Sequence, residues 1–175
     1  MGVTNMIKKS IGVLLCAAMM FSVVGCSKTA TDGNNSGTVQ ESQETSSDVS
    51  VKDLVSSVIN AEYIRAALEV DEQTAVDAYH INLEDVEEYA IAETQISPGP
   101  GFMVAVKAKE GKLDAVKEAV EKIKSDLVGK AFYPAEQEAA EKATVKVSGN
   151  IVYLTLFNDE VASDAEALIE STLNK

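Results

Sequence analysis

The change from strand periodicity to helix periodicity is clearest in residues 102–127, which read FMVAVKAKEGKLDAVKEAVEKIKSDL. In the first seven residues, apolar positions alternate with Met103, Ala105 and Lys107, which predicts a strand with one face in water. If the face with Met103 and Ala105 is the one in water, it is apolar enough to bind a partner. After Gly111 an amphipathic spacing predicts a helix packed on the sheet, with inward positions Leu113, Val116, Val120, Ile123 and Leu127.

Two helices and one strand are predicted on the N-terminal side of this unit. Residues 51–64 place apolar side chains on one helical face, and Ser50 is the expected cap. A second, short helix is expected from Asp71 to about His80. Residues 86–96 have the alternation of a strand, and the two prolines and two glycines of residues 97–101 predict a loop.

A second strand-strand-helix unit is predicted on the C-terminal side, after a short Glu-rich helix. Residues 144–148 and 151–157 form the expected hairpin around Gly149-Asn150, a pair that suits a type II′ turn. A helix over 160–173, capped by Asn158 or Asp159, closes the chain. The two units predict an α+β fold: a two-layer domain with a four-stranded antiparallel sheet and helices packed on one face.

Residues 1–25 have the pattern of a bacterial lipoprotein signal peptide, and Cys26 follows directly. Lys8 and Lys9 precede a 14-residue apolar stretch, residues 11–24, which is shorter than the roughly 20 residues needed to span a bilayer. Val23-Val24-Gly25-Cys26 follows the pattern of a lipobox. We therefore predict cleavage after residue 25 and lipidation of the Cys26 thiol by diacylglycerol carrying palmitate-like chains, which gives stable anchoring to the membrane.

Residues 26–50 predict the lipidated cysteine and a flexible linker, and residues 51–175 a single domain. The linker is rich in Ser, Thr, Gly and Asn, so its 24 residues after Cys26 have a reach of roughly 25 to 30 Å. The whole chain has a net charge of −13, and residues 51–175 contain 12 Lys and Arg against 24 Asp and Glu, a net charge of −12. This acidity argues against binding to nucleic acid or to anionic lipid headgroups.

The sequence offers no recognisable catalytic or metal-binding pattern, so we expect neither a metal site nor a cofactor. His80 is the only histidine, which excludes a two-histidine metal site. The two cysteines fall in the signal peptide and at the lipidation position, so a mature domain would have no thiol. Carboxylate pairs such as Glu87-Glu88 leave one enzymatic alternative, a small hydrolase that uses two carboxylates.

Several short segments in a fixed order carry a family resemblance: Tyr79-His80-Ile81, DVEEYA at 85–90, VAVKAKEGK at 104–112, AVKEA at 115–119, Tyr133-Pro134 and VSGNIV at 147–152. Together with the lipobox, they resemble the bacterial lipoprotein family catalogued as domain of unknown function 4358. The chain departs from that pattern at Gly101-Phe102, where an acidic residue is expected, and near residues 122–124, where an Arg is absent. The resemblance implies a secreted α+β domain and no assigned activity.

These observations lead to two functional hypotheses. The preferred one is an extracytoplasmic lipoprotein, anchored to the cell membrane, whose domain is a non-catalytic binding module for an envelope protein or a small ligand. The alternative is the carboxylate-dependent envelope hydrolase. An aromatic platform of Tyr89, Phe132 and Tyr133, with the 98–101 loop closing over it, is one candidate binding site. The candidate interaction residues are Tyr79, Glu88, Tyr89, Tyr133, Pro134 and Asn150.

Overall fold

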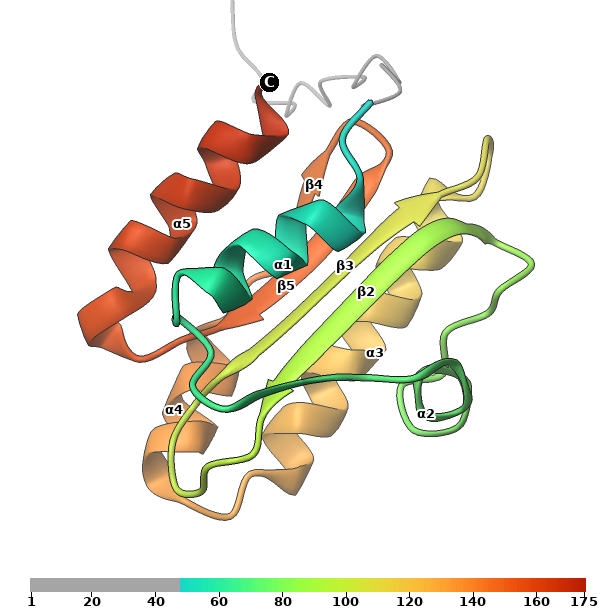
Figure 1. Ribbon diagram of the computed structural model, residues 1–175. Helices are drawn as coiled ribbons and strands as arrows, with labels where there is room; N and C mark the ends of the chain where they lie inside the picture. The colour runs from blue at the N-terminus through green and yellow to red at the C-terminus, as the bar shows by residue number, and fades with distance from the viewer. Residues whose placement is uncertain (1–47) are drawn as a thin grey trace, which may run out of the picture. The chain divides into compact units, whose positions relative to one another are not determined.

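The computed structural model describes residues 48–175. The predicted signal peptide, the lipobox with Cys26, and the linker up to residue 47 lie outside the described residues. The elements, in chain order, are α1 (Val51–Asn60), β1 (Ala67–Glu69), α2 (Glu72–Asp77), β2 (Val86–Thr94), β3 (Phe102–Ala108), α3 (Leu113–Lys130), α4 (Pro134–Lys142), β4 (Lys146–Ser148), β5 (Ile151–Leu156) and α5 (Asp159–Leu173) (Figure 1).

The sheet contains five strands in the order β1-β2-β3-β5-β4, and every neighbouring pair is antiparallel. Val104 of β3 lies between Ile91 of β2 and Leu154 of β5, so β3 is the middle of the sheet. The predicted α+β class and the antiparallel sheet are confirmed. The structure adds β1, a three-residue edge strand that the sequence did not predict.

Helices cover both faces of the sheet, which corrects the prediction that they pack on one face. Figure 1 shows α1 and α5 in front of the sheet and α3 and α4 behind it. The front layer buries Leu54, Val58 and Ile169 against Met103, Ala105 and Tyr153. The rear layer buries Val116, Val120 and Ile123 against Val104, Val106 and Leu154.

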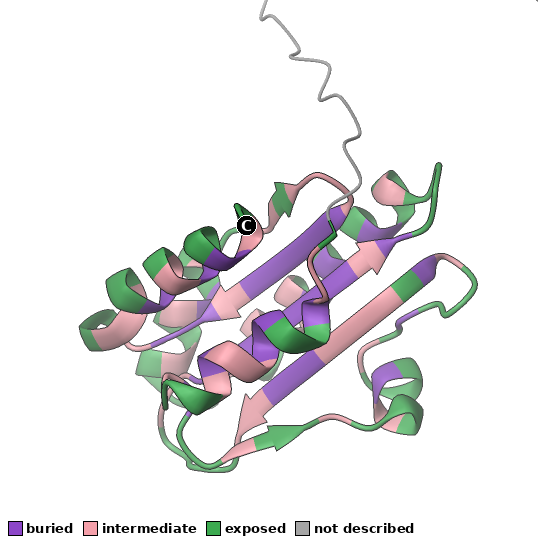
Figure 2. Cartoon of the chain, turned by 45° about the horizontal axis from the view of Figure 1, so that its top comes forward, coloured by how far each residue is buried: buried purple, intermediate pink, exposed green. Residues whose placement is uncertain are grey.

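The β3 face that was expected to be wet is therefore part of the core. Met103 and Ala105 have no exposed surface, because α1 packs over them. A strand buried on both faces has apolar residues at successive positions, and Phe102-Met103-Val104-Ala105-Val106 fits this rule. Buried residues accordingly follow one another along the central strands (Figure 2). The proposal of a partner site on Met103 and Ala105 is wrong.

Local signals place the ends of several elements correctly. The Ser50 side chain accepts a hydrogen bond from the backbone N–H of Asp53, so the predicted cap is confirmed. The Asp71 side chain accepts one from the N–H of Thr74 and caps α2, at the residue where this helix was expected to begin. Gly149 has a φ of 57°, as the first position of a type II′ turn requires. The first helix, in contrast, ends at Asn60 instead of continuing to residue 64.

Candidate functional site

The sheet has two ends that differ in what they contain. At the linker end, residues 48–50 lie beside Ser148, Gly149 and Lys175, around a surface hollow. At the loop end, the connection between β2 and β3, residues 95–101, lies beside the last residues of α3 and the first residues of α4 and α5 (Figure 1). Two clefts flank this connection.

The connection at the loop end is held in place from both sides. The Thr94 hydroxyl donates to the carbonyl of Arg65 at 2.6 Å and accepts from the N–H of Ile96 at 3.1 Å. Gly101 packs so closely on Thr94 that an added Cβ would lie 2.8 Å from the Thr94 Cβ. On the other side, the Glu136 carboxylate accepts from the N–H of Gly99 at 3.1 Å. The walls of both clefts are thus preorganised.

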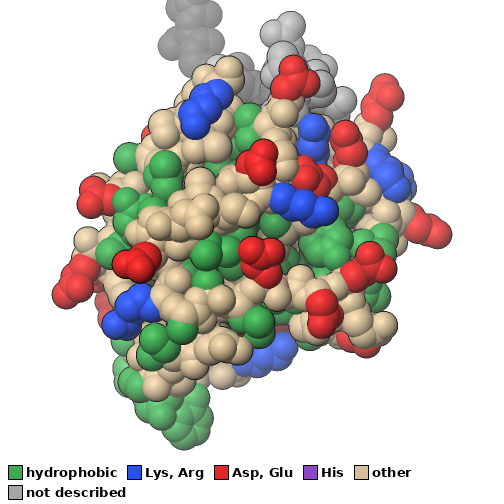
Figure 3. All heavy atoms as spheres, viewed as in Figure 1, with side chains coloured by type: hydrophobic (Ala, Val, Ile, Leu, Met, Phe, Trp, Pro, Cys, Tyr) green, Lys and Arg blue, Asp and Glu red, His purple; other side chains and the backbone are tan. Residues whose placement is uncertain are grey.

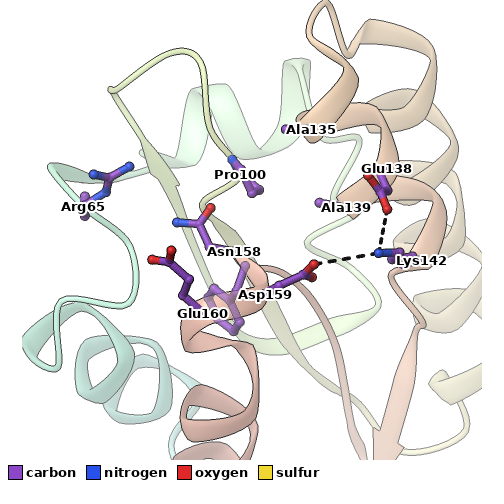
Figure 4. A pocket seen from close by; sticks show the side chains of 10 residues that line it. Arg65, Pro100, Ala135, Glu138, Ala139, Lys142, Asn158, Asp159 and Glu160 are labelled. Atoms are coloured by element: carbon purple, nitrogen blue, oxygen red, sulfur yellow. Dashed lines mark ion pairs between the residues drawn. The ribbon is translucent and has the colours of Figure 1, made fainter.

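Cleft A, of about 380 Å³, lies between α4, the start of α5 and Pro100. The Lys142 ammonium lies 2.7 Å from Glu138 and 3.9 Å from Asp159. The hydrogen bond from Lys142 holds the pKa of the Glu138 carboxyl below its usual range. In Figure 4, Arg65 stands on the wall opposite Lys142. The cleft therefore has a charged rim in which both signs are present.

Cleft B, of about 220 Å³, lies on the other side of the connection and is mostly apolar. Its charged residues are Glu93, Lys130 and Glu136. The Tyr79 hydroxyl donates to the Glu93 carboxylate at 2.5 Å, and burial raises the pKa of Tyr79 far above its usual value. The apolar lining consists of Ile96, Pro100, Phe102, Leu127, Ala131, Ala140 and Leu156.

An exposed aromatic pair adjoins cleft B. Phe132 follows the lining residue Ala131 and has 85% of its surface exposed, while Tyr133 is 39% exposed. Their rings meet edge to face with centroids 5.2 Å apart. Pro134 is the first residue of α4 and fixes the direction of the chain after this pair. Figure 3 shows hydrophobic side chains protruding at the lower end of the molecule, where Figure 1 places α4.

The other candidate residues lie elsewhere. Glu88 caps α1, since its carboxylate accepts from the Ser50 hydroxyl at 2.9 Å and the N–H of Val51 at 2.8 Å. Tyr89 lies with Glu88 in a separate hollow along β2. The Asn150 side chain donates to the carbonyl of Ala108 near the linker end. The structure therefore brings Tyr133 and Pro134 together with Phe132, but places Tyr89 and Asn150 away from them.

The hydrolase alternative requires two carboxylates in one cleft, one of them with a raised pKa. Glu93 and Glu136 both line cleft B. The carboxyl groups with a clearly shifted pKa all have it lowered; they are Asp71, Asp85, Asp126 and Glu138. His80 lies 3.9 Å from Asp126, outside both clefts. Within residues 48–175, no group of three or more His, Cys, Asp or Glu residues is placed to hold a metal ion.

Comparison with known proteins identifies the family but not an activity. The family model described as Domain of unknown function (DUF4358) matches residues 61–156, and the chain belongs to this family. No curated protein and no solved structure matches the chain. The matched residues include all five strands and α2 to α4, whereas α5 and the Asn158–Glu160 wall of cleft A follow them. None of the helices in the described part is long and apolar enough to cross a membrane.

Proposed function

We propose that this chain is an extracytoplasmic lipoprotein, anchored to the membrane through Cys26, and that its domain is a non-catalytic binding module. The N-terminal sequence supports the anchor: Lys8 and Lys9, an apolar stretch and Val23-Val24-Gly25-Cys26 follow each other in the order that lipoprotein processing needs. One structural observation carries the binding role. Two clefts and the aromatic ring that is most exposed among residues 48–175 lie at the loop end, while the chain enters the domain at the other end.

The exposed aromatic pair is the strongest part of this argument. A phenylalanine with 85% of its surface in water contributes little to the core, and its burial by a partner is favourable. Large aromatic residues beside a hollow are also the residue type that dominates binding energy in protein interfaces. The hydrogen bonds of Thr94 and Glu136 fix the neighbouring walls, so little conformational entropy is lost on binding.

The position of the linker fits this role. From its composition, the segment of 24 residues after Cys26 has an expected reach of roughly 25 to 30 Å, which would let the domain stand that far from an anchor at Cys26. A domain with a net charge of −12 is repelled by anionic headgroups, which keeps it away from the bilayer surface. Because the chain enters the described domain at residues 48–50, beside Ser148 and Lys175, the proposed anchor is attached at the end of the sheet opposite the loop end.

Cross-linking in intact cells tests both parts of the proposal. The photoreactive residue benzoylphenylalanine replaces Phe132 in the full-length chain, and Val147, which is 44% exposed on the edge strand β4, is the control position. We expect one discrete adduct from position 132, none from position 147, and loss of the adduct when Cys26→Ser releases the protein from the membrane. If both positions give the same adducts, or if neither gives an adduct, the binding role is contradicted. If the Cys26→Ser protein stays on the membrane, the lipid anchor is contradicted.

A further inference from the structure

We infer that the partner of the loop end is a basic protein segment that inserts one large apolar side chain into cleft B and lies against Phe132. This inference rests on the proposed binding function and names the class of partner. Three features of the loop end support it: the size of cleft B, the distribution of charge around the two clefts, and the location of Phe132.

The size of cleft B favours a side chain over a free small molecule. Its volume of about 220 Å³ is below the roughly 300 to 1,000 Å³ of typical ligand pockets. Ile96, Leu127 and Leu156 give it an apolar lining, which suits an aromatic or large aliphatic group. Phe132 follows the lining residue Ala131 in the chain and is 85% exposed, so a partner that fills the cleft can also cover its ring.

The charge around the clefts favours a basic partner. Glu93 and Glu136 line cleft B together with a single cation, Lys130. Cleft A has a similar small excess of carboxylates, because its charged lining residues are two cations, Arg65 and Lys142, and three carboxylates, Glu138, Asp159 and Glu160. The domain as a whole has a net charge of −12, so Lys or Arg residues that flank the inserted side chain would be attracted to this end.

The same charge argues against two other occupants. A second copy of the chain would bring two domains of net charge −12 together, and its own loop end would repeat the same excess of carboxylates. Anionic headgroups would be repelled for the same reason. A basic protein segment with an apolar anchor is the partner that satisfies the lining and the rim together.

Selection from a library of random twelve-residue peptides displayed on phage tests the inference without assuming a partner. The target is the full-length chain purified with its anchor in detergent micelles. Counter-selection uses the Phe132→Ser, Glu136→Gln double variant, which removes peptides that bind the acidic surface in general. Both substitutions leave the fold intact, because Phe132 is exposed and a glutamine oxygen still accepts the hydrogen bond from Gly99.

We expect the enriched peptides to have a net positive charge and at least one aromatic or large aliphatic residue. Each should bind at least tenfold more weakly to the double variant, and within twofold of the unchanged protein to a matched control, Val147→Ser with Glu118→Gln, whose residues are exposed elsewhere. Enrichment of neutral or acidic peptides, no enrichment, or equal loss in the control variant would overturn the inference. Cross-linking from position 132 distinguishes failure of this inference from failure of the proposed function. If position 132 gives a discrete adduct but the peptide selection fails, the binding function stands and only the basic partner is refuted.

Discussion

Polar side chains hold the fold together at both ends, but the loop end has the large side chain that is most exposed among residues 48–175, Phe132. Glu88 accepts two hydrogen bonds from the start of α1, and the Lys109 ammonium donates to the carbonyls of Leu83 and Glu84. At the loop end, Phe132 is 85% and Ile96 is 42% exposed. The difference indicates that substitutions at the linker end should lower stability, and those at the exposed surface of the loop end should change binding.

The largest expected effect on stability belongs to Glu88→Ala at the linker end. The substitution leaves the first N–H of α1 and the Ser50 hydroxyl without their carboxylate partner, so we expect the free energy of unfolding to fall by about 2 kcal/mol. Urea unfolding measures this loss. Glu87→Ala is the control, since the Glu87 side chain is largely exposed, and a change below about 0.5 kcal/mol is expected. Equal losses of unfolding free energy in the two variants would show that the Glu88 contact with the start of α1 does not stabilise the linker end.

A matched pair of glycine substitutions tests the rigid part of the loop end. In Gly101→Ala, the new Cβ meets the Thr94 side chain, and we expect a loss of about 1.5 kcal/mol in unfolding free energy. In Gly129→Ala, the new Cβ has open space in α3, and a gain of up to about 1 kcal/mol is expected from helix propensity.

The Thr94 hydroxyl forms hydrogen bonds to the backbone of both Arg65 and Ile96. Because the Cβ added in Gly101→Ala displaces Thr94, this substitution should also weaken the binding of the peptides selected on cleft B. A Gly101→Ala protein with unchanged stability and peptide affinity would show that Thr94 does not fix the clefts.

The raised pKa of Tyr79, next to cleft B, predicts a loss of stability at alkaline pH. Its folded-state pKa is raised by burial and by Glu93, so above about pH 10 the unfolded chain loses this phenol proton first. Stability is therefore lost as the pH rises, by at most about 1.4 kcal/mol per pH unit. Urea unfolding between about pH 9 and 11 should show this slope reduced in Tyr79→Phe. Tyr153, whose pKa is raised to about 12, is present in both proteins and adds the same pH dependence to each. An equally steep loss of unfolding free energy with pH in Tyr79→Phe would therefore contradict the prediction.

The smallest effects come from one ion pair at each end. Lys112 lowers the pKa of Asp85 at the linker end, and Lys142 lowers that of Glu138 at the loop end. Each pair therefore stabilises the fold above the unfolded-state pKa of its carboxyl group, and this stabilisation is lost as the pH falls through the folded-state pKa.

Asp85→Asn should cost more stability at neutral pH than Glu138→Gln, because the Asp85 side chain is less exposed and also accepts from Asn82. Unfolding measured from neutral to acid pH, at low and high salt, checks both. A larger loss in Glu138→Gln would reverse the proposed contrast between the ends.

The candidate site was only partly predictable. Tyr133, Pro134 and the 98–101 loop were singled out from the sequence, and the structure places them at the same end. Arg65 and Asn158 were not considered as site residues, although the unique arginine of the chain was visible in the sequence. These two residues come from segments more than 90 positions apart, and only the order of the strands brings both into cleft A.

The sequence by itself determined the features that depend on near neighbours: the approximate positions of the helices and of four of the five strands, the caps at Ser50 and Asp71, and the turn at Gly149. The tertiary structure alone decided that helices cover both faces, that Met103 is buried, and that Glu88 caps a helix 37 residues away. Local patterns depend on interactions within a few residues and can be read along the chain. Which elements meet depends on strand order, register and the packing of distant segments, and periodicity does not specify these.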